Sequence, residues 1–201
     1  ITTCDSDHKV KESLMNNKIN SLELECNHET RFDDCVQNIR LLEFFVEHYQ
    51  NDLAKTYIIT DEHIEHWHHG NITECLLDMK NKTIFDDFNF NGYFDYWNEE
   101  NFSKSSDWDL KNPPYSFYEL MNYFFNDMDI DWKGFNSYPA CSTFFVKAEM
   151  IRTHSINLYK KLIFKGRDWS RKHSEWKPYP GYYCGRIFEY SFHLLFGKSK
   201  I

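Results

Sequence analysis

The strongest constraint on the fold is an amphipathic stretch that leads directly into a compact apolar run. Between residues 33 and 50 the apolar side chains recur every three or four positions, which predicts an α-helix with one buried face. Residues 55–60 (Lys-Thr-Tyr-Ile-Ile-Thr) then have the pattern of a buried strand. A helix that feeds into a buried strand after a short link is typical of an α/β fold.

The rest of the chain repeats this alternation of strand and helix patterns. Strands are expected near 1–4, 21–26 and 141–146, and helices near 71–80, 117–125, 147–164 and 185–196. No internal repeat or low-complexity linker divides the 201 residues. We therefore expect one domain spanning 1–201, an α/β sandwich with a mostly parallel central sheet flanked by helices.

Charge and hydropathy exclude two classes of partner. The chain has 31 Asp and Glu against 23 Lys and Arg, a formal charge of −8, and phosphate backbones need clustered cations. No apolar run approaches the roughly 20 residues that a membrane-spanning helix needs. We therefore expect no nucleic-acid partner and no membrane span. The chain begins at Ile1, so a cytoplasmic location and, if a leader has been removed, the secretory pathway both stay open.

The composition is unusually aromatic, with Phe, Trp and Tyr at 18% and only three Ala. Two interpretations are open. The rings either replace small aliphatic side chains in the core, or they line a binding pocket. Six cysteines allow three disulfides, but their spacing matches no zinc or redox motif.

The densest chemical segment is residues 61–69, Asp-Glu-His-Ile-Glu-His-Trp-His-His. It directly follows the predicted strand, whose carboxyl end is expected to open onto the ligand-binding edge of the sheet. Such a cluster can supply a general base, ligate a transition metal through neutral imidazoles, or bind an anion through imidazolium groups. The alternative is a solvated loop whose histidines bond only to neighbours.

An Asp-x-Asp pair, Asp127 and Asp129, follows the helix predicted at 117–125. Paired carboxylates suit hard cations such as Mn²⁺ or Mg²⁺ held against a diphosphate. They are also common in solvated loops, and we regard both residues as weak metal candidates.

Two further segments carry charge. Arg186, Glu189 and His193 share one face of the last predicted helix. They could have a functional role there, or they could simply form a solvated ion pair. Residues 165–177 read as a basic loop interleaved with Trp169 and Trp176. That loop suits a diphosphate or an acidic glycan, or is simply solvated.

Three segments together resemble a largely uncharacterised, glycosyltransferase-like domain family of fungi, plants, bacteria and large DNA viruses. They are the helix and strand at 41–60, the segment 61–69 with its closing Trp-His-His, and the C-terminal half ending in "GRIFEYSFHLLFG". The resemblance covers about 30–80 and 138–197. The chain departs from the family where 33–37 lacks an Asn-x-Gly-x-Glu element, where Phe192 replaces a Trp, and near 1–7, where the opening strand is poorly represented.

The resemblance implies a single-domain nucleotide-sugar transferase fold, and transfer of a sugar from a nucleotide-sugar donor to a hydroxyl of a glycan or glycoprotein. Asp61 or Glu189 would be the base, and a bound Mn²⁺ or Mg²⁺ is optional. The expected substrate-binding residues are His63, Trp67, His68, His69, Arg186 and His193. Two alternatives stay open: an inactive carbohydrate-binding or interaction domain of the same fold, and a metal-dependent hydrolase that uses the His cluster.

Overall fold

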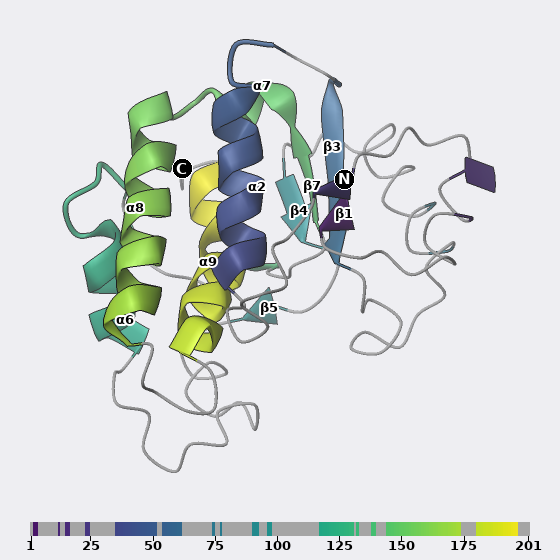
Figure 1. Ribbon diagram of the computed structural model, residues 1–201. Helices are drawn as coiled ribbons and strands as arrows, with labels where there is room; N and C mark the ends of the chain where they lie inside the picture. The colour runs from purple at the N-terminus through teal and green to yellow at the C-terminus, as the bar shows by residue number, and fades with distance from the viewer. Residues whose placement is uncertain are drawn as a thin grey trace.

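The computed structural model describes a helical layer and the strands beside it (Figure 1). The described residues are 2–3, 12, 15–16, 23–24, 35–51, 54–61, 74, 77, 90–92, 96–97, 117–130, 132, 138–139, 144–173 and 180–196. Their strands are β1 (Thr2–Thr3), β2 (Glu23–Leu24), β3 (Thr56–Asp61), β4 (Phe90–Gly92), β5 (Tyr96–Trp97), β6 (Tyr138–Pro139) and β7 (Phe144–Lys147). Their helices are α2 (Cys35–Glu47), α6 (Phe117–Phe125), α7 (Ala148–Ile151), α8 (Ile156–Lys172) and α9 (Pro180–Phe196).

The described strands form a mixed sheet in the order β2-β1-β3-β7-β4, and β5 pairs separately with β6. β1 is parallel to β2 and to β3, whereas β7 is antiparallel to both β3 and β4. The predicted mostly parallel central sheet is therefore not seen. The longest strands, β3 and β7, pair antiparallel, and the parallel pairs among the described strands are only those that the two-residue strand β1 makes with β2 and β3. The error has a simple reason, since a compact apolar pattern reports that a strand is buried but not in which direction it runs.

The kind of element was predicted correctly more often than the residues at which it begins and ends. The stretch at 33–50 forms α2, and the run at 55–60 forms β3, as predicted. The single helix predicted at 147–164 is instead two, because Ser155 adopts an extended conformation before α8 begins. α8 then continues to Lys172, so the first half of the predicted basic loop is helical. Among the described residues, none of the helices is long and apolar enough to cross a membrane.

The core is built largely from phenylalanine. Phe188, Phe192 and Phe196 recur every four residues on α9 and stack with ring centroids 6.4 and 5.8 Å apart. Phe144 of β7 lies 4.8 Å from Phe192, and Phe45 of α2 lies 5.5 Å from Phe196. All five side chains are at most 2% exposed. In the described part of the chain, aromatic side chains therefore fill core positions that Ala, Val and Leu fill in other proteins.

Candidate functional site

The candidate site lies at the edge of the sheet where β3 ends. Asp61 is the last residue of β3, and Thr3 of β1 lies opposite it in parallel register. The carboxyl ends of β1 and β3 therefore share one edge, which is where open α/β sheets usually bind ligands. The short link from α2 to β3 makes α2 run antiparallel to β3, so α2 begins toward the same edge (Figure 1).

A buried hydrogen bond brings the start of α9 to the same end of the molecule. Asn38, in the first turn of α2, is 7% exposed and donates from Nδ2 to the backbone oxygen of Gly185 at 3.4 Å. Gly185 is itself buried, and its missing side chain lets the two helices approach closely. Cys184, the preceding residue, is fully buried and disulfide-bonded. The glycine of the terminal motif therefore has a packing role.

The other residues of the terminal motif lie progressively further along α9 from this anchor. Arg186 follows Gly185 directly and is nearest to the edge. At about 1.5 Å of rise per residue, Glu189 lies roughly 6 Å and His193 roughly 12 Å beyond Gly185 along the helix axis. Glu189 is half-buried, whereas His193 is only 5% exposed and lies within the helical layer.

The His-rich segment is described only at its first residue. The backbone of Asp61 is fixed by its place in β3, but its side chain lies outside the described part, as do His63, Trp67, His68 and His69. For Arg186 likewise only the helical backbone is described. The topology thus places Asp61 and the beginning of the terminal motif toward the same end of the molecule, and the roles of these side chains stay predictions.

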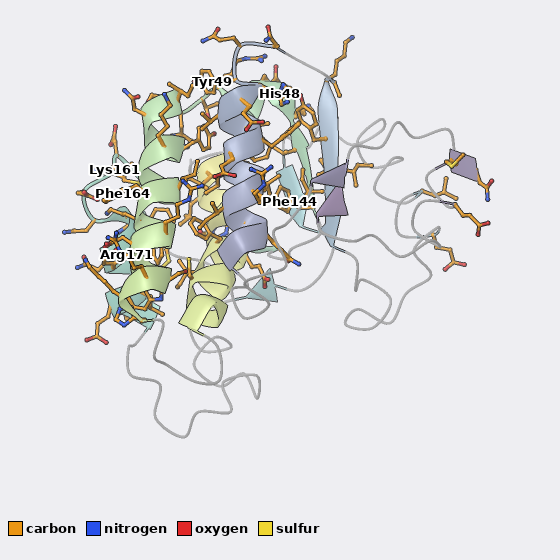
Figure 2. All side chains as sticks on the ribbon, viewed as in Figure 1. His48, Tyr49, Phe144, Lys161, Phe164 and Arg171 are labelled. Carbon is orange, nitrogen blue, oxygen red and sulfur yellow. The ribbon has the colours of Figure 1, made fainter. Side chains whose placement is uncertain are left out.

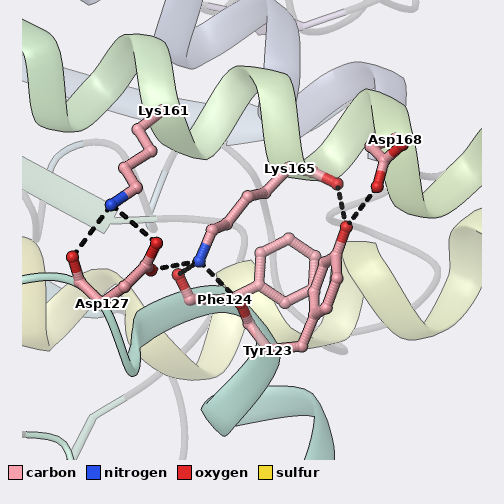
Figure 3. A network of polar contacts seen from close by, with 6 residues as sticks. All are labelled: Tyr123, Phe124, Asp127, Lys161, Lys165 and Asp168. Atoms are coloured by element: carbon pink, nitrogen blue, oxygen red, sulfur yellow. Dashed lines mark hydrogen bonds and ion pairs between the residues drawn. The ribbon is translucent and has the colours of Figure 1, made fainter.

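Asp127 is held in an ion-pair network (Figure 3). Lys161 Nζ donates to its Oδ2 at 2.7 Å, and Lys165 Nζ donates to Oδ1. These hydrogen bonds, first from Lys161 and then from Lys165, lower the pKa of the Asp127 carboxyl to about 2. Lys165 also donates to the carbonyls of Tyr123 at 2.8 Å and Phe124 at 3.2 Å, which caps the C-terminal end of α6.

The network favours a structural role for Asp127, because both of its oxygens already accept hydrogen bonds from ammonium groups. Its predicted companion Asp129 is exposed. Within the described ranges, no three His, Cys, Asp or Glu side chains are grouped so that they could hold a metal ion. Residues 62–70 are not among those ranges, so the metal prediction for the His-rich segment stays a prediction.

A pocket opens at the opposite end of β3, near Tyr57. Its lining includes Phe44, His48 and Tyr49 from the end of α2, and Arg152 after α7. Its volume of about 10 Å³ is enough for roughly one water molecule. Ligand pockets for small molecules are usually about 300–1,000 Å³, so this hollow does not accommodate a nucleotide sugar.

Two residues that matter to the geometry escaped the sequence reasoning. Asn38 was missed because a polar residue early in an amphipathic helix predicts a solvent-facing position, and only the contact with α9 explains its burial. Trp169 was assigned to a sugar-binding or solvated loop, but it is 3% exposed and packs 5.2 Å from the ring of Tyr123. The helical spacing of Trp169 from Leu162 was the available signal for its burial.

Comparison with known protein families gives a match over most of the chain. The model of a family described as "Protein of unknown function (DUF3431)" matches residues 33–201. The matched range contains β3, the segment 61–69 and α9, but neither β1 nor β2. No curated protein and no solved structure matches the chain.

Proposed function

The chain belongs to the DUF3431 family of proteins of unknown function, and we propose that it is a glycosyltransferase. It would transfer a sugar from a nucleotide-sugar donor to a hydroxyl of a glycan or glycoprotein acceptor. The observation that carries this proposal is the Asn38–Gly185 hydrogen bond. It ties the start of the terminal motif on α9 to the first turn of α2, and α2 begins toward the same end of the molecule as the carboxyl end of β3.

Strand directions support the finer part of the proposal, a single-domain nucleotide-sugar transferase fold. β1 and β2 run parallel to β3, and β4, being antiparallel to β7, runs in the same direction as β3. In such a sheet the crevice outside the carboxyl ends of the strands is the usual place for a nucleotide. The donor would therefore lie beyond Asp61 and Thr3.

The reaction requires a base and groups that stabilise the negative charge of the departing diphosphate. The acceptor hydroxyl attacks the anomeric carbon of the sugar, its proton passes to a carboxylate, and the bond from that carbon to the diphosphate breaks with its electron pair leaving on the phosphate. Asp61 is the first candidate for the base because it is the last residue of β3, at the carboxyl end where the donor is expected. Glu189, deeper along α9, is the second candidate.

The remaining candidate residues would bind the donor. Arg186 is the best placed to contact the departing diphosphate, because it directly follows Gly185, whose carbonyl accepts the hydrogen bond from Asn38. Guanidinium groups also match phosphate geometry. His63, His68 and His69 would donate hydrogen bonds to phosphate or sugar hydroxyls, and Trp67 would stack on a sugar face. His193, buried in the helical layer, would act from behind the site. A Mn²⁺ or Mg²⁺ ion is not required by this scheme.

The first test is a thermal-shift screen of nucleotide sugars with and without Mn²⁺, because a ligand that binds the folded state raises the melting temperature by mass action. The donor found in this way is then used to measure release of nucleoside diphosphate in the presence of glycan acceptors. Asp61→Asn is expected to lower the rate by about 10²–10⁴-fold while donor binding persists. Glu189→Gln tests the second candidate in the same assay.

Glu47→Gln is the matched control, since it makes the same carboxylate-to-amide change at an exposed residue at the end of α2 that lies away from Asp61. Full activity in both Asp61→Asn and Glu189→Gln would refute the assignment of the base. Donor binding without transfer to any acceptor would instead identify a carbohydrate-binding domain. Hydrolysis that depends on added zinc, iron or manganese and needs no nucleotide sugar would identify a metal-dependent hydrolase.

A further inference from the structure

The outer face of α8 combines an exposed phenyl ring with a row of cations. The exposed positions follow a regular three-and-four spacing along the helix: Asn157, Lys160, Phe164, Arg167 and Arg171. Phe164 is 66% exposed, the second most exposed large apolar side chain among the described residues. Figure 2 shows it pointing away from the body of the protein, between Lys161 and Arg171.

This helix is strongly basic in an acidic chain. α8 carries six Lys and Arg and a single acidic residue, Asp168, which gives it a charge of +5. The whole chain is at −8, so the remainder carries −13. α8 therefore carries a net positive charge in a chain whose remainder is net negative.

Among the described residues, two of the three carboxylates that pair with the cations of α8 are recessed beneath them. The third, Asp127, is 53% exposed and pairs with Lys161 and Lys165 on the flank of α8 that faces α6. Asp168 accepts from Arg171 at 2.8 Å and from Lys172 at 2.6 Å, and Glu43 of α2 pairs with Arg167. The side chains of Asp168 and Glu43 are 11% and 15% exposed, whereas those of Arg171, Lys172 and Arg167 are 77%, 60% and 64% exposed. Asp168 and Glu43 thus hold Arg167, Arg171 and Lys172 from the inside, and these cations are the outermost groups on this face.

We propose that the outer face of α8 binds the surface of a lipid bilayer that contains anionic phospholipids, with Phe164 inserted among the lipids. A helix on the outside of a protein can lie flat along a membrane surface. The cations from Lys160 to Lys172 span about 18 Å along the axis of α8. Anionic headgroups neutralise the protruding cations, and the acyl region beneath them takes up the phenyl ring. A free phosphate would neutralise the cations but leave Phe164 in water.

The charge of the rest of the chain favours one orientation. The residues outside α8 carry a net charge of −13, which an anionic surface repels, so we expect the outer face of α8 to turn toward the bilayer. The contact lies on the membrane surface and needs no spanning helix. Its binding strength falls as salt screens the cations.

The test is co-sedimentation of the purified protein with vesicles of phosphatidylcholine alone or with about a third phosphatidylserine. We expect binding only to the vesicles with phosphatidylserine. Lys160→Gln is expected to weaken the partition coefficient about five-fold, as is typical for one cation near an anionic membrane. Phe164→Ser is expected to weaken it roughly tenfold, and Phe164→Leu, which keeps an apolar side chain, to retain it.

Lys55→Gln is the charge-matched control, because Lys55 is an exposed lysine outside α8, between α2 and β3. Circular dichroism of each variant confirms that it folds. Equal binding to pure phosphatidylcholine, no binding to either vesicle, or equal losses in Lys55→Gln and Lys160→Gln would overturn the proposal. Binding to poly-glutamate that depends on Phe164, without vesicle binding, would assign the face to an acidic protein instead.

Discussion

The aromatic column of α9 makes a quantitative prediction about what stabilises the fold. Phe196 is fully buried and lies at the C-terminal end of the column. Its ring centroid is 5.5 Å from that of Phe45, 5.8 Å from Phe192, 6.0 Å from Phe144 and 6.5 Å from Tyr159. One side chain thus joins α2, α8, α9 and β7, and Phe196→Ala would leave a cavity where these four elements meet.

The expected loss follows from burial and packing. Truncating a fully buried Phe to Ala usually costs about 3–5 kcal/mol, and four aromatic neighbours place Phe196 toward the upper part of that range. A domain of this size typically has only about 5–15 kcal/mol of stability. At roughly 2–4 °C per kcal/mol, the melting temperature of Phe196→Ala should fall by about 10 °C or more.

The assay is urea unfolding followed by circular dichroism, with Phe164→Ala as the matched control. Phe164 is the same residue type on a neighbouring helix, but it is 66% exposed, so its truncation should change the unfolding free energy by less than about 0.5 kcal/mol. A loss below about 1 kcal/mol for Phe196→Ala, or equal losses in the two variants, would refute the argument that the aromatic surplus builds the core.

Two further predictions concern titratable groups. Burial lowers the pKa of His154 below its ordinary 6.5, against hydrogen bonds with the backbone of Leu194 and Leu195 and the charge of Asp129. The stability that neutral His154 contributes is therefore present above pH 6.5 and lost as the pH falls toward the lower folded-state pKa. Urea unfolding at several pH values should show a steeper acid loss in the natural protein than in His154→Gln, and identical slopes would contradict this. Asp127→Asn should cost less than about 1 kcal/mol, because the Asp127 side chain is 53% exposed, and should leave any Mn²⁺-dependent thermal shift unchanged. Loss of such a shift would restore Asp127 as a metal ligand.

The candidate site was only partly accessible to sequence reasoning. The position of Asp61 at the end of a buried strand was predicted from the apolar run before it, and β3 confirms it. The proximity of this edge to the start of α9 was not predictable from spacing, because 123 positions separate Asp61 from Cys184 along the chain. It depends on Asn38 and Gly185, whose contact forms only when α2 and α9 pack together.

Local periodicity determined the elements that depend on their own residues. The amphipathic spacing at 33–50 and the apolar run at 55–60 were sufficient to predict α2 and β3, because the spacing of apolar residues in each segment indicates which side chains are buried. Tertiary structure alone decided that β7 runs antiparallel to β3 and that Asp127 pairs with two lysines. Each of these depends on contacts between residues distant in sequence. Such contacts leave no periodic signal, since their free energy arises only when separate elements meet.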